Sequence, residues 1–546
     1  MDPKKLVGKT IDVEGKGVGT VLSFAKKLSP LSDSLHRIKF VSGGQQMLLL
    51  HRSKLGKSNK GSKFKIVKNA AESAGTSLAQ PLPSKTVQPQ QPPVASLRED
   101  RLAIAASLAA HPEKTGMPPS SLGWVGTRGR AFVVGGKEVV LRGVNWFGFE
   151  TETLCPHGLW QRPLDSMLNQ ILELPANLLR LPFCNDIFSK GAQPSAGSIN
   201  TGPGFNPALE GVTCLGLLDL VVHGCGQRGI RVLLDRHRPT SSAQSELWYN
   251  PRSRTKRRDP QRAEEGGAAA AGGGGNGDHS PLKEETGYAS PRDTELEWIE
   301  DWVFLARRYS DEPCVIGADL HNEPCGPATW GGGDVLTDWR LAAERCGNAV
   351  LAANPKWLVV VEGVESAGGL RTWWGGNLAG VGDACHVRLS VPGALVYSAH
   401  DYPASVYRQA WFDAPDFPAN LPAVWDQHWG FLLSSDKQAS GQGQGGGVPV
   451  LLGEFGTFAS SDEDLVWLGA LLEYATHQNL SFAFWCLNPN SADTGGLLLD
   501  DWRTLHAAKH AVLKPLLVHA AKTTGLSRYK EEAAGAASVA AEYTDF

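Results

Sequence analysis

Two glutamates that end separate apolar runs are the residues best placed to do chemistry. Glu323 closes the run Val315–Pro324, and Glu454 lies near the end of the run Val448–Phe455. In an enzyme built from parallel strands, the carboxyl ends of the strands carry the reacting groups. Two carboxyl groups at one such mouth suit the cleavage of a glycosidic bond, where one protonates the leaving oxygen and the other meets the anomeric carbon.

The two glutamates are expected to take different roles. Glu323 would be the acid, its pKa raised by a negative neighbour and partial burial, whereas Glu454 would stay ionised with Arg180 and Tyr402 as partners. The alternative is that Glu323 is a solvated loop residue, because a tripeptide such as Asn-Glu-Pro also arises by chance.

The elements that would position these residues alternate along the chain. Eight apolar, strand-like runs are Glu138–Asn145, Ala176–Pro182, Ile230–His237, Val315–Glu323, Trp357–Gly363, Leu395–Tyr402, Val448–Phe455 and Leu480–Trp485. Amphipathic helical stretches between them include Leu164–Leu174, Gly211–Arg228, Thr294–Tyr309, Asp338–Asn354 and Ser461–Gln478. This order predicts the α/β class, as a (β/α)8 TIM barrel. A doubly wound sheet is disfavoured because no glycine-rich phosphate loop opens a helix.

Seven of the eight expected strand ends carry polar or aromatic side chains: Asn145, Arg180, His237, Glu323, His400, Glu454 and Trp485. Buried polar groups without partners are costly, so stability alone gives no reason for this pattern. The 17 tryptophans add flat surface on which sugars stack, although a single tryptophan in a barrel is more often part of the core.

Composition divides the 546 residues into several parts. Residues 1–68 hold 15 Lys or Arg against 4 Asp or Glu and read as a small all-β, barrel-like module. A disordered Pro/Gln/Ala-rich linker is expected at 69–116, the barrel at 117–520 and a C-terminal tail at 521–546. A basic and then Gly/Ala-rich insertion at 251–290 interrupts the barrel. The basic module could contact a polyanion, or its charges could simply be a solvated face.

The nine scattered cysteines are odd in number and form no C-x-x-C pair, which favours reduced thiols over a disulfide framework or a zinc site. The chain as given shows no signal peptide and no membrane segment. We therefore expect an intracellular protein, unless the N-terminus is incomplete, and a monomer.

Six motifs make residues 121–505 resemble glycoside hydrolase family 5, and in particular its bacterial endo-β-1,4-glucanases. They are Gly143–Thr151, Leu234–Pro239, Asp319–Pro324, Val396–Tyr402, Leu452–Thr457 and Asn488–Gly496. The resemblance implies retaining double displacement on a β-glucan polysaccharide or oligosaccharide, with Glu323 as acid/base and Glu454 as nucleophile. It also implies a supporting set of Arg180, His237, Asn322, His400, Tyr402 and Trp485, and outer substrate contacts from Trp160, Trp374, Tyr407 and Gln409.

The resemblance implies no cofactor. His237 and His400 alone could bind a metal, but no third ligand of suitable spacing follows from the sequence, so we expect no metal. Secreted bacterial relatives carry cysteine pairs where this chain has Ser241, Thr329 and Gly332, which argues against secretion.

Other functions stay open at this point. A β-mannanase or another β-glucanase would have the same barrel, because outer loops decide specificity. A catalytically silent glycan-binding protein and a nucleic-acid-associated protein are the alternatives from other classes; the second rests only on the charge of residues 1–68 and 252–258.

Overall fold

A computed structural model describes residues 117–526, apart from 243, 250–290, 383 and 434–446, together with the backbone of five strands nearer the N-terminus. Side chains at 291–293 are outside the description. The chain divides into two compact units, Met1–Pro92 and Pro93–Phe546. The predicted linker at 69–116, the insertion at 251–290 and most of the predicted tail at 521–546 lie outside the described residues.

The first unit contains one antiparallel sheet with the strand order β4-β3-β2-β1-β5. Its strands are β1 (Thr10–Val13), β2 (Gly17–Lys27), β3 (Ser34–Phe40), β4 (Gln45–Leu50) and β5 (Phe64–Ile66). The side chains of this unit are outside the description, so the small barrel and its polyanion contact stay predictions.

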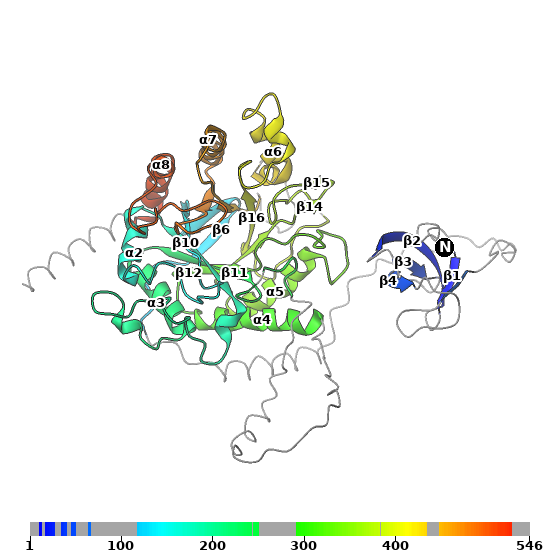
Figure 1. Ribbon diagram of the computed structural model, residues 1–546, viewed down its shortest axis with the longest axis horizontal. Helices are drawn as coiled ribbons and strands as arrows, with labels where there is room; N and C mark the ends of the chain where they lie inside the picture. Colours follow the sequence, from blue (N-terminus) through cyan, green and yellow to red (C-terminus); the bar gives the residue numbers. More distant parts are fainter. Residues whose placement is uncertain are drawn as a thin grey trace, which may run out of the picture. The chain divides into compact units, whose positions relative to one another are not determined.

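Eight parallel strands close into the predicted barrel (Figure 1). In chain order they are β9 (Arg142–Asn145), β10 (Leu178–Cys184), β11 (Arg231–Arg238), β12 (Val315–Asp319), β13 (Leu358–Glu362), β16 (Leu395–Asp401), β17 (Val450–Phe455) and β18 (Ser481–Phe484), with β18 pairing back to β9. Nearly every residue in these strands is buried, as expected for parallel strands covered by helices on the outside and filled by side chains within.

The outer layer of the barrel is helical, and Figure 1 shows helices around the strands. They are α2 (Leu164–Glu173), α3 (Cys214–Gln227), α4 (Pro291–Arg308), α5 (Trp339–Ala353), α6 (Leu421–His428), α7 (Asp462–His477) and α8 (Ala507–Thr524). Short 3-10 turns are η2 (Asn185–Phe188), η3 (Pro207–Leu209), η4 (Ala410–Asp413) and η5 (Gly430–Leu433), and a two-residue hairpin pairs β14 (Ser366–Ala367) with β15 (Leu370–Arg371). Helix α8 continues past residue 520, and Leu526 is fully buried, so the packed domain extends into the predicted tail.

Two predicted strands have different limits in the structure. The first run, Glu138–Asn145, splits because β8 (Lys137–Val139) pairs with β7 (Ala131–Val134), which pairs with β6 (Val125–Arg128). This small sheet packs Val125, Phe132 and Val139 against Leu178, Leu233 and other residues near the starts of the barrel strands. It therefore closes the end of the barrel opposite the polar strand ends.

The fourth predicted strand, Val315–Glu323, ends at Asp319 rather than Glu323. Glu323 has a φ of +55°, a left-handed conformation that a strand cannot accommodate, and Pro324 follows it. The chain thus turns out of the sheet just where its catalytic candidate lies.

All nine cysteines are free, and eight of them are buried, in agreement with the prediction of reduced thiols. Burial raises the pKa of the Cys155 thiol to about 11, so the thiol form dominates near neutral pH.

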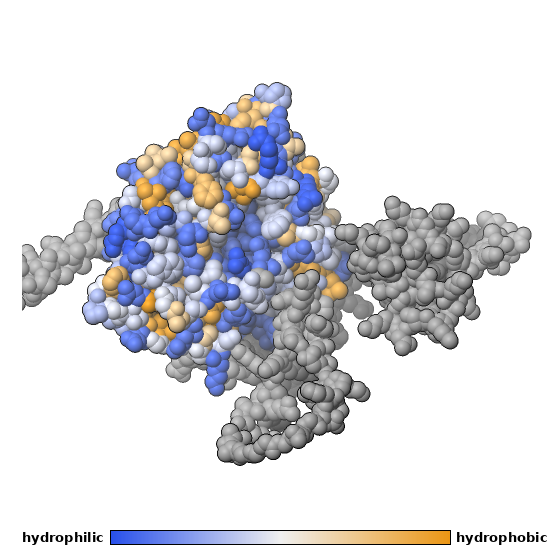
Figure 2. Space-filling view, in the orientation of Figure 1, coloured by the Kyte–Doolittle hydropathy of each residue, from blue (hydrophilic) through white to orange (hydrophobic). Residues whose placement is uncertain are grey.

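Within the described residues, no helix has the length and apolar character needed to span a membrane. Figure 2 shows a face of mixed hydropathy. The exposed apolar residues include Leu465 and Val466 on α7 and Val512 on α8.

The barrel wall leaves no room for a side chain at Gly143 in β9. A Cβ there would lie 1.6 Å from the carbonyl oxygen of Leu178 in the neighbouring strand, and backbone cannot rotate away. We expect Gly143→Ala to lower the free energy of unfolding by roughly 3 kcal/mol or more, measured by urea denaturation. Gly126→Ala is the control, because its Cβ would meet nothing closer than 3.8 Å. Equal stability of the two variants would contradict the packing described here.

Candidate active site

The guanidinium of Arg180, in β10, lies at the centre of the polar strand ends. It is fully buried. Its five N–H groups donate to five side chains from four strands or their ends: Asp319 Oδ2 at 2.9 Å, Asn145 Oδ1 at 3.1 Å, Glu454 Oε1 at 2.5 Å, Asn322 Oδ1 at 3.0 Å and Glu362 Oε1 at 3.0 Å. Asp235 Oδ2 lies 3.1 Å from the same guanidinium. One cation therefore joins the ends of β9, β10, β11, β12, β13 and β17.

Four carboxyl groups around one buried cation cannot all be charged at low cost. Burial raises the pKa of Asp235 to about 6 and that of Asp319 to about 7. Burial and the nearby Asp319 raise the pKa of Glu362 well above its usual value. The cluster therefore keeps protons near neutral pH instead of carrying its full negative charge.

Glu454 is held by two donors, as the sequence predicted. Arg180 donates to its Oε1, and the hydroxyl of Tyr402 donates to its Oε2 at 2.7 Å. Burial raises the pKa of Tyr402 well above its usual value, so its hydroxyl keeps its hydrogen and remains a donor. Both oxygens of Glu454 therefore accept hydrogen bonds, which fix the orientation of its carboxyl group.

Glu323 has a different environment. His400 Nδ1 lies 3.1 Å from its Oε1, and Gln244 Nε2 donates to its Oε2 at 3.1 Å. Its side chain is 16% exposed, so it can meet a substrate. Burial raises its pKa, the direction that suits a general acid, whereas the bond from Gln244 lowers it.

The two glutamates lie close together. Oxygens of Glu323 and Glu454 are within 4.8 Å of one another, with a nitrogen of His400 inside the same distance. Glycosidases that form a covalent intermediate hold their two carboxyl groups about 5–5.5 Å apart, whereas those that place a water between them need about 6.5–9.5 Å. The short separation is compatible with the first arrangement.

Asn322, His237 and Trp485 complete the predicted supporting set. His237 Nδ1 pairs with Asp235 Oδ2 at 2.6 Å, and burial lowers the pKa of His237 to about 3, so its ring is neutral. Asn322 Nδ2 lies 3.4 Å from His237 Nε2. The partly exposed ring of Trp485 is nearly parallel to that of His237, with ring centres 5.2 Å apart, and provides flat apolar surface beside the glutamates.

The four predicted outer residues connect to this centre less directly. Trp160 contacts His157, which contacts Phe147 and through it Trp485. The ring of Trp373 packs edge-on against that of Tyr402, with ring centres 5.9 Å apart. Trp373 in turn contacts Tyr407. Trp374 and Tyr407 are 47% and 66% exposed, which suits substrate platforms, and Gln409 is half-buried just before η4. Their roles as substrate contacts stay predictions.

Sequence reasoning missed two residues that contact the centre. Glu362 follows the apolar residues 358–361 at the end of β13, a signal visible in the sequence, yet strand five was the one end given no polar residue. Gln244 lies in the loop after β11, where no periodic pattern marks it. Both reach Glu323, through its backbone and its side chain respectively.

The expectation that no third group accompanies either histidine was wrong. Three sets of side chains are close enough to share an ion: Asp235 with His237 and Glu454, Glu323 with His400 and Glu454, and Asp235 with Asp319 and Glu362. The folded barrel brings together groups that are far apart in sequence. Arg180 already provides a positive charge to the acidic members of these sets other than Glu323.

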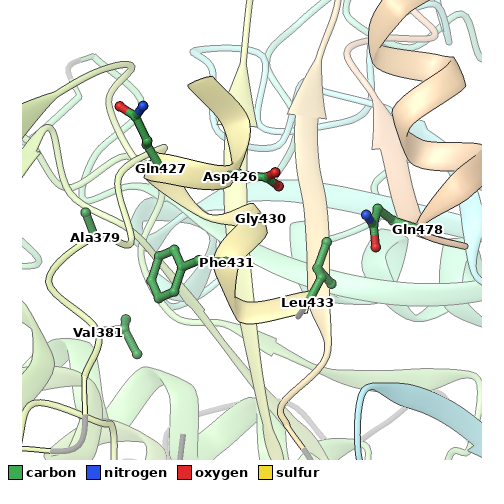
Figure 3. A pocket seen from close by; sticks show the side chains of 8 residues that line it. All are labelled: Ala379, Val381, Asp426, Gln427, Gly430, Phe431, Leu433 and Gln478. Carbon is green, nitrogen blue, oxygen red and sulfur yellow. The ribbon is translucent and has the colours of Figure 1, made fainter. Parts of the chain in front are cut away.

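A separate cavity of about 710 Å³ lies between α6, η5 and the end of α7 (Figure 3). It is lined by Ala379, Val381, Asp426, Gln427, Gly430, Phe431, Leu433 and Gln478, none of which belongs to the cluster around Arg180. The chemistry therefore belongs to the mouth of the barrel and not to this cavity.

A family model described as "Cellulase (glycosyl hydrolase family 5)" matches residues 135–491. The chain is 42% identical over 397 residues to an endoglucanase of Paenibacillus polymyxa, covering 72% of this chain and 86% of that protein. It is 37% identical over 399 residues to the major extracellular endoglucanase of Xanthomonas campestris, covering 71% and 70% respectively.

The chain belongs to glycosyl hydrolase family 5. It is a glycosidase that hydrolyses O-glycosyl bonds. Among solved structures, the catalytic domain of the Xanthomonas campestris enzyme superposes with a TM-score of 0.59 at 36% identity, over 72% of this chain and 99% of that one. A hyperthermophilic endocellulase of Pyrococcus horikoshii gives a TM-score of 0.59 at 34% identity, over 73% and 100%.

In this family 5 enzyme, hydrogen bonds hold the loop after β11 at Ser241. The resemblance implies a cysteine at this position in secreted members. The backbone N–H and the hydroxyl of Ser241 both donate to Asp186 Oδ2 at 2.7 Å. The loop that carries Gln244 thus has a polar attachment three residues before it.

Loss of the Gln244 donor should change the pH dependence of the enzyme. A general acid works only while protonated, so activity falls as pH rises through the pKa of Glu323. Because the bond from Gln244 lowers that pKa, Gln244→Leu should move the alkaline limb of kcat/KM to higher pH. The measurement is a kcat/KM profile between pH 4 and 9.

Gln244→Glu is a second variant for the same profile. It replaces the donor by a negative charge beside Glu323, so the alkaline limb should move further in the same direction. Unchanged profiles in both variants would contradict the assigned contact.

Proposed function

We propose that this enzyme is a retaining endo-β-1,4-glucanase in which Glu323 is the acid/base and Glu454 the nucleophile. The observation that carries the proposal is the pair of carboxyl groups within 4.8 Å in two opposed environments. Glu454 accepts hydrogen bonds on both of its oxygens, whereas burial raises the pKa of Glu323. That division matches the two tasks of a double displacement.

In the first step, Glu323 gives its proton to the glycosidic oxygen while Glu454 attacks the anomeric carbon. The bond from that carbon to the leaving sugar breaks, and an ester to Glu454 forms. Tyr402 and Arg180 hold the attacking oxygens in place, so the reaction needs little reorganisation of the site.

In the second step, Glu323 is ionised and takes a proton from water. The oxygen of that water attacks the anomeric carbon of the sugar. Glu454 leaves as a carboxylate, and the sugar regains its original configuration. Gln244 and His400 lie against the two oxygens of Glu323 and can stabilise its charge at this stage.

The relatives support β-1,4-glucan as the substrate. Two curated relatives above 35% identity are named endoglucanases. Solved structures of the Pyrococcus horikoshii endocellulase, at 33% identity, include complexes with cellotetraose. Two of those complexes carry a glutamate-to-alanine change and one a tyrosine-to-phenylalanine change, the residue types that meet at Glu323, Glu454 and Tyr402 here.

The proposal predicts that Glu454→Ala loses on the order of 10⁴-fold or more in kcat on carboxymethyl-cellulose, because no group remains to form the ester. The measurement is release of reducing sugar from carboxymethyl-cellulose, mixed-linkage glucan and mannan by purified protein. Glu473→Ala, an exposed glutamate on α7, is the control and should keep wild-type activity.

Cleavage of mannan alone would reassign the substrate and leave the mechanism standing. Full activity in Glu454→Ala would contradict the mechanism. Binding without turnover of any of the three by folded wild-type protein would favour the glycan-binding alternative.

A further inference from the structure

Glu362 is the buried group that contacts most of the catalytic machinery without belonging to the predicted site. It ends β13 and has no exposed surface. Its Oε2 accepts the backbone N–H of Glu323 at 2.7 Å, and its Oε1 accepts from Arg180 at 3.0 Å. Through Arg180 it reaches the nucleophile Glu454 as well.

The backbone contact accounts for the conformation of the acid/base. Glu323 has a φ of +55°, which costs about 1–3 kcal/mol for a residue other than glycine and persists only when its surroundings impose it. The bond from its N–H to Glu362 is such a constraint. It fixes the direction in which the Glu323 side chain leaves the loop.

A second route from Glu362 to Glu323 runs through His400 of β16. His400 Nε2 lies 3.5 Å from Glu362 Oε1, and His400 Nδ1 lies 3.1 Å from Glu323 Oε1. Burial lowers the pKa of His400 to about 4, so the ring is neutral and carries one hydrogen. Whichever nitrogen carries it determines whether His400 donates to Glu323 or accepts its proton.

The loop after β13 packs against this contact. Gly375 has a φ of +69°, and a Cβ there would lie 2.4 Å from Glu362 Oε2, 3.3 Å from Glu323 Cα and 3.4 Å from His400 Nδ1. The glycine lets backbone approach all three residues and exclude other groups from them.

We infer that Glu362 is the positioning residue of the acid/base: it holds the Glu323 backbone and keeps the hydrogen of His400 on Nε2. His400 Nδ1 then accepts from the protonated Glu323, which orients the proton that the reaction transfers. The inference rests on the proposed function, because it assigns a partner to the acid/base of that mechanism.

The charge around Glu362 fits this arrangement. Burial raises the pKa of both Glu362 and Asp319, so this pair does not carry its full negative charge near neutral pH. The oxygens of Glu362 face N–H donors from Arg180 and Glu323. Both oxygens of Glu362 thus accept from its neighbours, and its Oε1 also lies 3.5 Å from His400 Nε2.

Leaving-group dependence separates this role from a general structural one. Protonation matters for a poor leaving group and hardly at all for dinitrophenolate, which departs as a stable anion. Glu362→Ala should therefore lower kcat/KM on phenyl β-cellobioside on the order of 10²-fold, and on 2,4-dinitrophenyl β-cellobioside less than about threefold. A similar loss on both substrates would overturn the inference.

Asp319→Asn is the matched control, since Asp319 contacts Arg180 but has no hydrogen bond to Glu323. The fall in kcat/KM caused by Asp319→Asn should be similar for the two substrates, whatever its size. The reason is that this substitution acts through Arg180 and the nucleophile. A selective loss on the phenyl substrate in Asp319→Asn, equal to that of Glu362→Ala, would overturn the inference.

Glu362→Gln keeps the shape of the side chain and is the variant to use if Glu362→Ala does not fold. Its amide can donate to His400 Nε2, which moves the ring hydrogen to Nδ1 and toward Glu323. Donation to Glu323 favours its ionised form, so the alkaline limb of kcat/KM should move to lower pH. A limb that stays in place would contradict the assigned hydrogen on His400.

The other groups that face Glu323 are unchanged in these variants: Gln244, His237 and Asp235 from β11 and its loop, Arg180 from β10, and Glu454 from β17. Failure of the two proposals is distinguishable. If wild type fails to cleave dinitrophenyl cellobioside, or Glu454→Ala cleaves it normally, the proposed function fails and the inference with it. If Glu454→Ala is inactive but Glu362→Ala is not selective, only the inference fails.

Discussion

One buried guanidinium holds the active end of this barrel together. Arg180 contacts four carboxyl groups and two amide oxygens from strands that are distant in sequence. Removing the cation would leave several carboxyl groups buried without a partner, and such a loss typically costs about 3–5 kcal/mol. The position of the nucleophile and the ends of most barrel strands therefore depend on the same side chain.

The position of Arg180 also gives the two glutamate side chains different surroundings. Glu454 accepts a hydrogen bond from Arg180 on one oxygen and from Tyr402 on the other. Glu323 has no direct bond to Arg180, lies in a strained loop, and has its pKa raised by burial. Contact with the cation thus distinguishes the two glutamates, and Glu362 joins their environments because it contacts both the cation and the Glu323 backbone.

Much of this could be predicted from the sequence, and the misses have physical reasons. Apolar runs alternating with amphipathic helices predicted the closed barrel, and the residues ending those runs predicted Arg180, Tyr402 and both glutamates. Strand limits failed at Glu138 and Glu323, because pairing within the small sheet β6–β8 and a left-handed turn override local β propensity. Glu362 and the third groups beside His237 and His400 were missed because closure of the barrel, not spacing along the chain, brings them together.

The most direct test of the mechanism is to trap the ester. Wild-type enzyme incubated with 2,4-dinitrophenyl 2-deoxy-2-fluoro-β-cellobioside should release one equivalent of dinitrophenolate. The fluorine slows both steps, whereas the good leaving group keeps the first step fast enough for the ester to accumulate. Mass spectrometry of the digested protein should then find one fluorocellobiosyl group on the peptide that contains Glu454. An adduct on another residue, or hydrolysis of the natural substrate with inversion and no adduct, would contradict the account.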